Sequence, residues 1–157
     1  MLGYTLEALI GDPEVLRPVV QRWPVAALVT LDAGLSLIPL TDELFDAAGG
    51  GSASKPLGFW KLPAQFDRGL AGWSAAGPVA YVEAEFFGGV GTQRAALWTG
   101  GRLALGPLFA DEDEPFDPAG SPISQVLARL GVGREGHHDE FDAVGLGRHR
   151  DTEGWLS

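Results

Sequence analysis

Hydrophobic and polar positions alternate along the first residues of the chain, as they do in a half-buried β-strand. Between residues 3 and 10, one face carries Tyr4, Leu6, Ala8 and Ile10, and the other carries Thr5, Glu7 and Leu9. This period of two predicts a strand. Asp12 and Pro13 then predict the N-cap and the first position of a helix, which the interior Pro18 should shorten or kink.

β-prone runs of residues occur in close succession farther along the chain. Residues 25–31 and 35–40 are joined by a short glycine-containing turn, as in a hairpin. Residues 78–87, 92–98 and 102–108 form three more runs, separated by short glycine-rich connections. Strands joined so tightly pair antiparallel. The pattern therefore predicts hairpins and a meander, and it argues against βαβ units.

Helical periodicity occupies the stretches between these strands. Thr41 can cap a short helix that stops by Gly49, and residues 62–76 and 121–131 each carry one apolar stripe at helical spacing. The order of elements predicts an α+β fold, with a mainly antiparallel sheet of about five or six strands and helices packed on one face. At 157 residues, we expect residues 1–157 to form a single domain.

Composition limits the cellular compartment and the kinds of metal site that we expect. The chain has no cysteine, which excludes disulfides and thiolate-bound metals. Its first residues lack the pattern of a secretory signal, and no apolar run reaches the roughly 20 residues of a membrane span. We therefore expect a cytoplasmic protein that does not bind membranes. Many glycines and only two lysines, Lys55 and Lys61, indicate a GC-rich bacterial genome.

Net charge restricts the partners that the protein can bind. The chain has 21 acidic and 11 basic residues, a net charge of −10. More than half of the acidic residues follow residue 110. Such a field repels nucleic-acid phosphates and attracts basic proteins. We expect no nucleic-acid binding and, if there is a protein partner, a basic one.

The third strand-rich region contains the first candidate for chemistry. Alternation places Tyr81, Glu83, Glu85 and Phe87 on one face of a predicted central strand. The Cα atoms of Glu83 and Glu85 would lie about 7 Å apart, so their carboxylates could share a proton, a metal or an arginine. The alternative is a structural role, on a solvent-facing strand or in buried ion pairs.

The glycines at residues 88–91 do not form a nucleotide-binding motif. A phosphate-binding loop needs a lysine followed by serine or threonine, and a dinucleotide fingerprint needs a following helix. Here Thr92 and Gln93 follow and begin a predicted strand. The chain also lacks a nucleophile elbow of the Gly-x-Ser-x-Gly type. We expect a hairpin turn at these glycines and no cofactor.

Two clusters of charged residues lie near the end of the chain. Residues 137–142 (HHDEFD) contain possible metal ligands, but their spacing matches no known metal site, and a solvated acidic loop explains them. We therefore expect no metal there. Arg148 and Arg150 form the basic cluster of this acidic region. We expect them to pair with Glu83 and Glu85, with anion binding as the alternative.

Two segments carry a resemblance to other proteins. The segments EAEFFGGVGTQ, at residues 83–93, and DEFDAVGLGRHRDTEGW, at residues 139–155, resemble those of a family of small, uncharacterised bacterial proteins. The resemblance implies that the two segments meet in one site or one core, and it implies no activity. In size and charge the chain is also similar to bacterial toxin-neutralising immunity proteins.

Two functional hypotheses follow from the sequence. The first is a protein-binding module, inhibitor- or immunity-like, that presents acidic residues 111–114 and 139–142 to a basic protein. The second is a carboxylate- or metal-dependent enzyme, in which Glu83 and Glu85 act with Arg148 or Arg150 on an anionic substrate. A separate prediction is that the C-terminal segment is integral to the fold and docks on the strand that carries the two glutamates, with Arg148 or Arg150 within salt-bridge reach of one of them.

Overall fold

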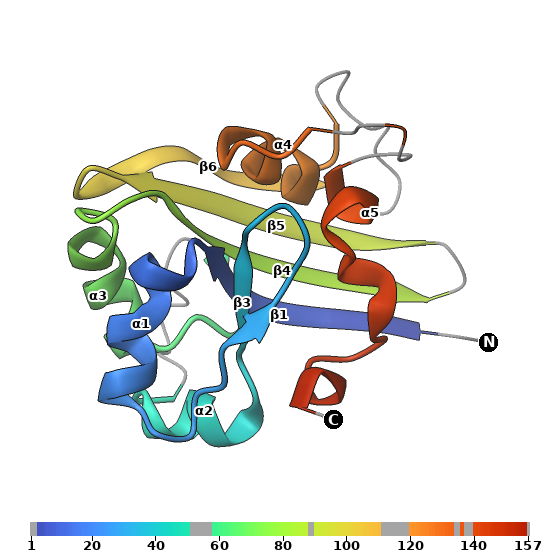
Figure 1. The fold of residues 1–157 in the computed structure, drawn as a ribbon. Helices are drawn as coiled ribbons and strands as arrows, with labels where there is room; N and C mark the ends of the chain where they lie inside the picture. Colours follow the sequence, from blue (N-terminus) through green and yellow to red (C-terminus); the bar gives the residue numbers. More distant parts are fainter. Residues whose placement is uncertain are drawn as a thin grey trace.

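A computed structural model of the protein describes residues 3–50, 58–87, 90–110, 120–133, 136 and 140–156. These residues form one six-stranded antiparallel sheet with the strand order β2-β3-β1-β4-β5-β6 (Figure 1). Its strands are β1 (Gly3–Gly11), β2 (Val29–Thr30), β3 (Ser36–Pro39), β4 (Val79–Phe87), β5 (Val90–Thr99) and β6 (Arg102–Ala110). The predicted α+β class and antiparallel sheet are confirmed.

Three of the helices begin where the sequence predicts, at residues whose side chains cap the first turn. The helices are α1 (Pro13–Arg22), α2 (Asp42–Ala47), α3 (Ala64–Trp73), α4 (Pro122–Arg129) and α5 (Glu140–Val144), followed by the 3-10 turns η2 (Leu146–Arg148) and η3 (Glu153–Leu156). Asp12, Thr41 and Ser121 each accept a hydrogen bond from a first-turn backbone amide. Among the described residues, no helix is long and apolar enough to cross a bilayer.

Helices cover both faces of the sheet, and not one face as the sequence analysis predicts. Residues of α1, α2 and α3 pack in one core with Leu9 of β1 and Tyr81 of β4. Residues of α4 and α5 pack in a second core with Ile10 and Val82 of the same two strands. The prediction failed because β1 and β4 bury apolar side chains on both faces, so each face needs its own cover.

The predicted hairpins are present. The strand β2 is shorter than the run of residues 25–31 that predicts it. The first hairpin pairs β2 with β3, and its turn places Ala33 and Gly34 at positive φ. Strands β4, β5 and β6 form the predicted meander, with Phe87 opposite Val90. Gly88 and Gly89, for which a hairpin turn is predicted, lie outside the described residues.

The C-terminal segment packs on β1, the central neighbour of β4. The Thr5 amide donates to the Arg150 carbonyl at 2.8 Å, and the Tyr4 hydroxyl donates to the Leu146 carbonyl at 2.9 Å. Trp155 is buried in the second core. The segment is integral to the fold as expected, but among the described residues its hydrogen bonds to the central strands reach β1 and not β4, the strand that carries Glu83.

Neighbouring residues of η3 provide a matched test of this docking. Trp155 is 4% exposed and Leu156 is 52% exposed. We expect Trp155→Ala to lower the free energy of unfolding by about 3 kcal/mol, because it empties a large buried volume. Leu156→Ala should change it by less than about 0.5 kcal/mol. Urea denaturation followed by circular dichroism measures both values, and equal midpoints would show that the tail does not stabilise the sheet.

Candidate functional site

The carboxylate of Glu83 is buried on β4, with 1% of the residue exposed. Its Oε1 accepts a hydrogen bond from the Trp60 amide at 2.8 Å. Its Oε2 accepts from the Lys61 amide at 2.7 Å and from the Tyr81 hydroxyl at 2.8 Å. One side chain of the sheet therefore holds the backbone of the segment that leads into α3.

Glu7 lies directly opposite Glu83 in the antiparallel register of β1 and β4. Residues paired in this way have Cα atoms about 4.5 to 5.5 Å apart and side chains on the same face. A carboxylate oxygen of Glu7 accepts a hydrogen bond from the Thr152 hydroxyl, whose oxygen accepts from the Glu7 amide at 3.1 Å. Two neighbouring carboxylates thus anchor two different segments, the tail and the segment before α3.

Both carboxylates have a raised pKa. Burial raises the pKa of Glu7, and the charge of Glu83 raises it further, against the hydrogen bond from Thr152 and the charge of Lys61. Burial also raises the pKa of Glu83, against its three hydrogen bonds and the charge of Arg94. The pKa of Tyr81 rises for the same reason and because Glu83 is near. The pair therefore holds protons more tightly than exposed glutamates do.

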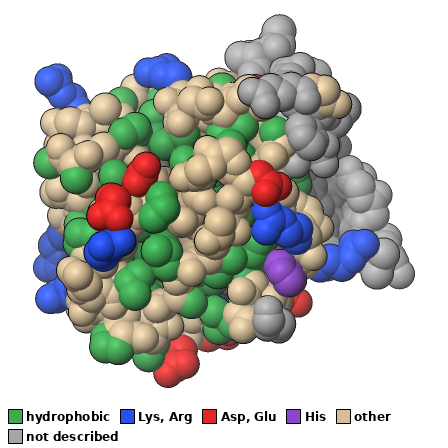
Figure 2. Space-filling model, viewed as in Figure 1, with side chains coloured by type: hydrophobic (Ala, Val, Ile, Leu, Met, Phe, Trp, Pro, Cys, Tyr) green, Lys and Arg blue, Asp and Glu red, His purple; other side chains and the backbone are tan. Residues whose placement is uncertain are grey.

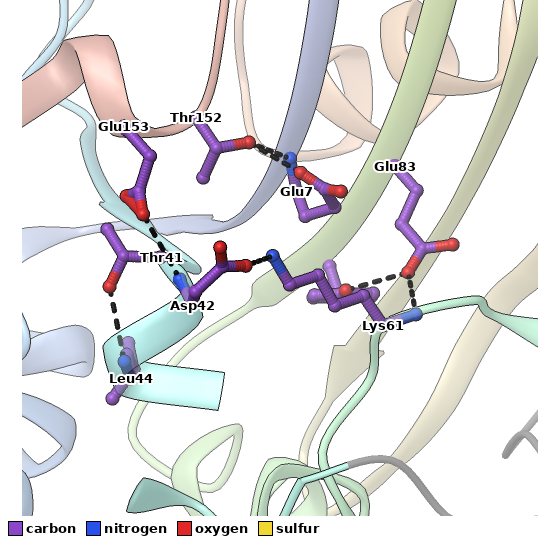
Figure 3. A network of polar contacts seen from close by, with 9 residues as sticks. Glu7, Thr41, Asp42, Leu44, Lys61, Glu83, Thr152 and Glu153 are labelled. Atoms are coloured by element: carbon purple, nitrogen blue, oxygen red, sulfur yellow. Dashed lines mark hydrogen bonds and ion pairs between the residues drawn. The ribbon is translucent and has the colours of Figure 1, made fainter. Parts of the chain in front are cut away.

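A surface ion pair extends this network toward α2. Lys61 Nζ lies 2.6 Å from Asp42 Oδ1, and the Asp42 side chain is 82% exposed. The hydrogen bond and charge of Lys61 lower the pKa of Asp42. The Asp42 amide donates to Glu153 Oε1 at 3.3 Å. Figure 3 shows how Glu153, Asp42 and Lys61 link the C-terminal segment, α2 and the segment before α3.

Arg94 stands on the other side of Glu83, opposite it on β5. Its Cζ lies 3.8 Å from the centre of the Trp60 ring and 5.6 Å from the centre of the Phe109 ring. Arg94 Nη1 is buried and has no hydrogen-bond partner among the residues that the structure describes. Trp60 and Phe109 are 41% and 48% exposed. We call Trp60, Arg94 and Phe109 the Arg94 stack.

The structure separates the residues that the sequence analysis groups together. Glu83 is at the centre of the network, whereas Glu85 is exposed. Arg148 Nη2 lies 3.2 Å from Asp32 Oδ2, and in the described chain neither Arg148 nor Arg150 pairs with Glu83 or Glu85. That predicted pairing is wrong. The tail crosses the sheet at β1, and Arg94 places its positive charge next to Glu83 instead.

The other two candidate clusters, residues 111–114 and 137–142, lie wholly or partly outside the residues that the structure describes. Residues 111–114 and 137–139 are not among the described residues, and neither is the side chain of Asp142. Glu140 is buried at the start of α5. Across the described ranges, no group of three or more His, Asp or Glu side chains is arranged to hold a metal ion.

Sequence reasoning missed Glu7, Trp60, Lys61 and Arg94 as members of the site. Glu7 and Arg94 fall on the same faces of their strands as apolar core residues, which is a signal that a sequence contains. Their meeting at Glu83 depends on the pairing of β1 and β5 with β4. The sequence pattern within one strand does not determine which strands pair or in which register.

Comparison with protein-family models gave no match, and comparisons with curated proteins and with solved structures gave none either. The resemblance of the two segments to a bacterial family therefore stays an expectation. Its structural part is confirmed, because Ala84 of the first segment and Val144, Leu146 and Trp155 of the second belong to one buried core.

The hydrogen bonds of Glu83 predict a difference between two glutamates on one strand. In Glu83→Gln an amide NH2 would face backbone N–H groups or the Tyr81 hydroxyl, so at least one buried donor would lose its acceptor. We expect a loss of about 1 to 3 kcal/mol in the free energy of unfolding. The control Glu85→Gln, at an exposed position, should cost less than about 0.5 kcal/mol. Equal losses in urea denaturation would contradict the anchoring role of Glu83.

The raised pKa of Glu7 predicts how stability changes with pH. In the folded state Glu7 binds its proton more tightly than in the unfolded chain, where its pKa is near 4.5. The contribution of Glu7 to the free energy of unfolding therefore falls as pH rises from 4.5 through its raised pKa, and it is level above that pKa. Glu7→Gln removes this loss and keeps an acceptor for Thr152. The stability of Glu7→Gln relative to wild type should rise with pH in urea denaturation, and a constant difference would contradict the shift.

Proposed function

We propose that the protein is a small acidic binding module for a basic protein, and that the Arg94 stack is the centre of its contact surface. The observation that carries the proposal is the exposure of Trp60 and Phe109 around an arginine. Most other large apolar side chains of the described chain are buried. Tryptophan and arginine are among the residue types enriched in residues that dominate binding energies, and phenylalanine is also enriched at interfaces.

The surroundings of the stack favour binding because they hold it in place before a partner arrives. The Trp60 backbone is fixed by Glu83, and its ring lies against Arg94. Gly58, at a φ of 80°, lies beside Phe109, and a Cβ there would come within 3.2 Å of the ring. Side chains that are already ordered lose less entropy on binding.

Charge supports a basic partner. The net charge is −10, and exposed Glu85 and Asp42 are on the same side of the sheet as Glu83. Acidic and basic side chains are interspersed among hydrophobic ones on the face seen in Figure 2. We therefore attribute the steering of a basic partner to the net charge and not to one acidic patch on that face. An inhibitor- or immunity-like role fits these properties.

Carboxylate chemistry is the second candidate function. The raised pKa values of Glu7 and Glu83 favour it, because perturbed carboxylates are frequent in active sites. It ranks second because three donors already occupy Glu83, and because Arg148 lies at the β2–β3 hairpin. An activity in a substrate screen that wild type has and Glu7→Gln lacks would favour this function over binding.

Binding by the Arg94 stack predicts the effect of truncating its rings. Immobilised wild type should retain a basic protein from a lysate of the source organism, and retention should weaken as salt is added. We expect Trp60→Ala and Phe109→Ala to weaken the affinity for that purified protein about tenfold or more, measured by calorimetry.

The control for this experiment is Leu28→Ala, which truncates an apolar side chain that is 38% exposed and outside the stack. It should bind as wild type does. Circular dichroism should show that all variants are folded. Retention of no basic protein, or equal affinity for the wild type and the two ring variants, would contradict the proposal.

A further inference from the structure

The space between α1 and α3 shares no lining residue with the Arg94 stack. A cavity of about 460 Å³ opens there, within the range of small-molecule sites. Its lining residues are Arg22, Trp23, Gln65, Arg68, Gly69 and Trp73. Arg22 and Trp23 come from the end of α1, and the other four come from one side of α3 at steps of three, one and four residues.

The aromatic wall of the cavity depends on a glycine. A Cβ at Gly69 would lie 2.6 Å from the Trp73 ring, a distance that real structures do not tolerate. Glycine therefore lets this ring lie against its own helix. The Trp73 ring also packs edge-on against Trp23, with centres 5.9 Å apart, and against Phe66, with centres 5.4 Å apart. Trp73 is half-buried, so part of it faces the opening.

The charged groups of the cavity are both positive. Arg22 Nη2 donates to Gln65 Oε1 at 3.0 Å, and Arg22 Cζ lies 5.0 Å from the Trp23 ring centre. Arg22 is therefore held in position. Arg68 is exposed and makes no hydrogen bond or ion pair with any part of the chain that the structure describes. The lining contains no acidic residue.

Two arginines in one cavity are unexpected in this protein. Only 11 of its 157 residues are basic, and the net charge of −10 disfavours anions near most of its surface. Guanidinium groups match carboxylates and phosphates through paired hydrogen bonds. An anionic group would satisfy Arg68 and a free donor of Arg22, and a planar ring attached to it would stack on the exposed part of Trp73.

We propose that this cavity binds a small molecule in which a carboxylate or phosphate group is attached to a planar ring. The anionic group lies between Arg22 and Arg68, and the ring contacts Trp73. The ligand has no part in the contact of the Arg94 stack with a protein, so the two sites are tested separately.

Calorimetric titration with phenyl phosphate, benzoate and inorganic phosphate tests the site. We expect saturable binding of at least one ring-bearing anion, with a Kd of about 1 mM or lower, and weaker binding of inorganic phosphate. Whether phenyl phosphate or benzoate binds more tightly distinguishes a phosphate ligand from a carboxylate ligand. Benzyl alcohol, which keeps the ring without the charge, should bind at least about tenfold more weakly.

Three variants locate the binding. Arg22→Gln and Arg68→Gln should each weaken it about tenfold or more. The fold should tolerate Arg68→Gln, because that side chain is exposed and has no partner within the described ranges. Arg129→Gln makes the same charge change at an exposed position on α4, outside the cavity, and should bind as wild type does.

The proposal is overturned if neither ring-bearing anion binds saturably, or if benzyl alcohol binds as tightly as they do. It is also overturned if Arg129→Gln weakens binding as much as Arg68→Gln, because the effect would then come from net charge alone. Gly69→Ala adds a test of the ring contact. Displacement of Trp73 by the new Cβ should reduce the preference for the ring-bearing anion over inorganic phosphate.

Discussion

The arrangement of the surface around Trp60 depends on the buried carboxylate of Glu83. Burying a carboxylate is costly unless donors or cations compensate it. Two backbone amides and one hydroxyl donate to Glu83, and Arg94 adds a positive charge from the next strand. The same amides belong to the residues that carry the Trp60 ring and the Lys61 ammonium. The cost of burial is therefore offset by contacts that also position an exposed aromatic side chain.

Glu7 repeats this arrangement one strand away. The hydrogen bond that Glu7 accepts from the Thr152 hydroxyl offsets part of the cost of burying its carboxylate. The same contact ties the C-terminal segment to β1. The two glutamates face the same side of the sheet and raise the energy of each other's charged form. Each is tolerated because a different irregular segment supplies its donors. Side chains of the two central strands thus position both the segment before α3 and the C-terminal segment.

Much of the fold could be predicted because its signals are local. The caps at Asp12, Thr41 and Ser121 and the tight hairpins need only neighbouring residues, and all are present. Alternation also placed Glu83 and Tyr81 correctly on one face of β4. It could not identify the partners of Glu83, because Glu7 and Arg94 reach it through strand order and register. The five-residue α5 is too short to show a period and went unpredicted. The helix α4 was predicted, but no local signal states which face of the sheet it covers.

The contact of Thr152 with Glu7 of β1 also affects when this part of the fold forms during synthesis. Glu7 and Thr152 are 145 residues apart, and the contact between them can form only after Thr152 has left the ribosome. Contacts of such long sequence separation form late, since a long loop must close before they stabilise the fold. Until then the Glu7 side of β1 lacks this cover, and the nascent chain exposes part of its central strand to chaperones or to other copies.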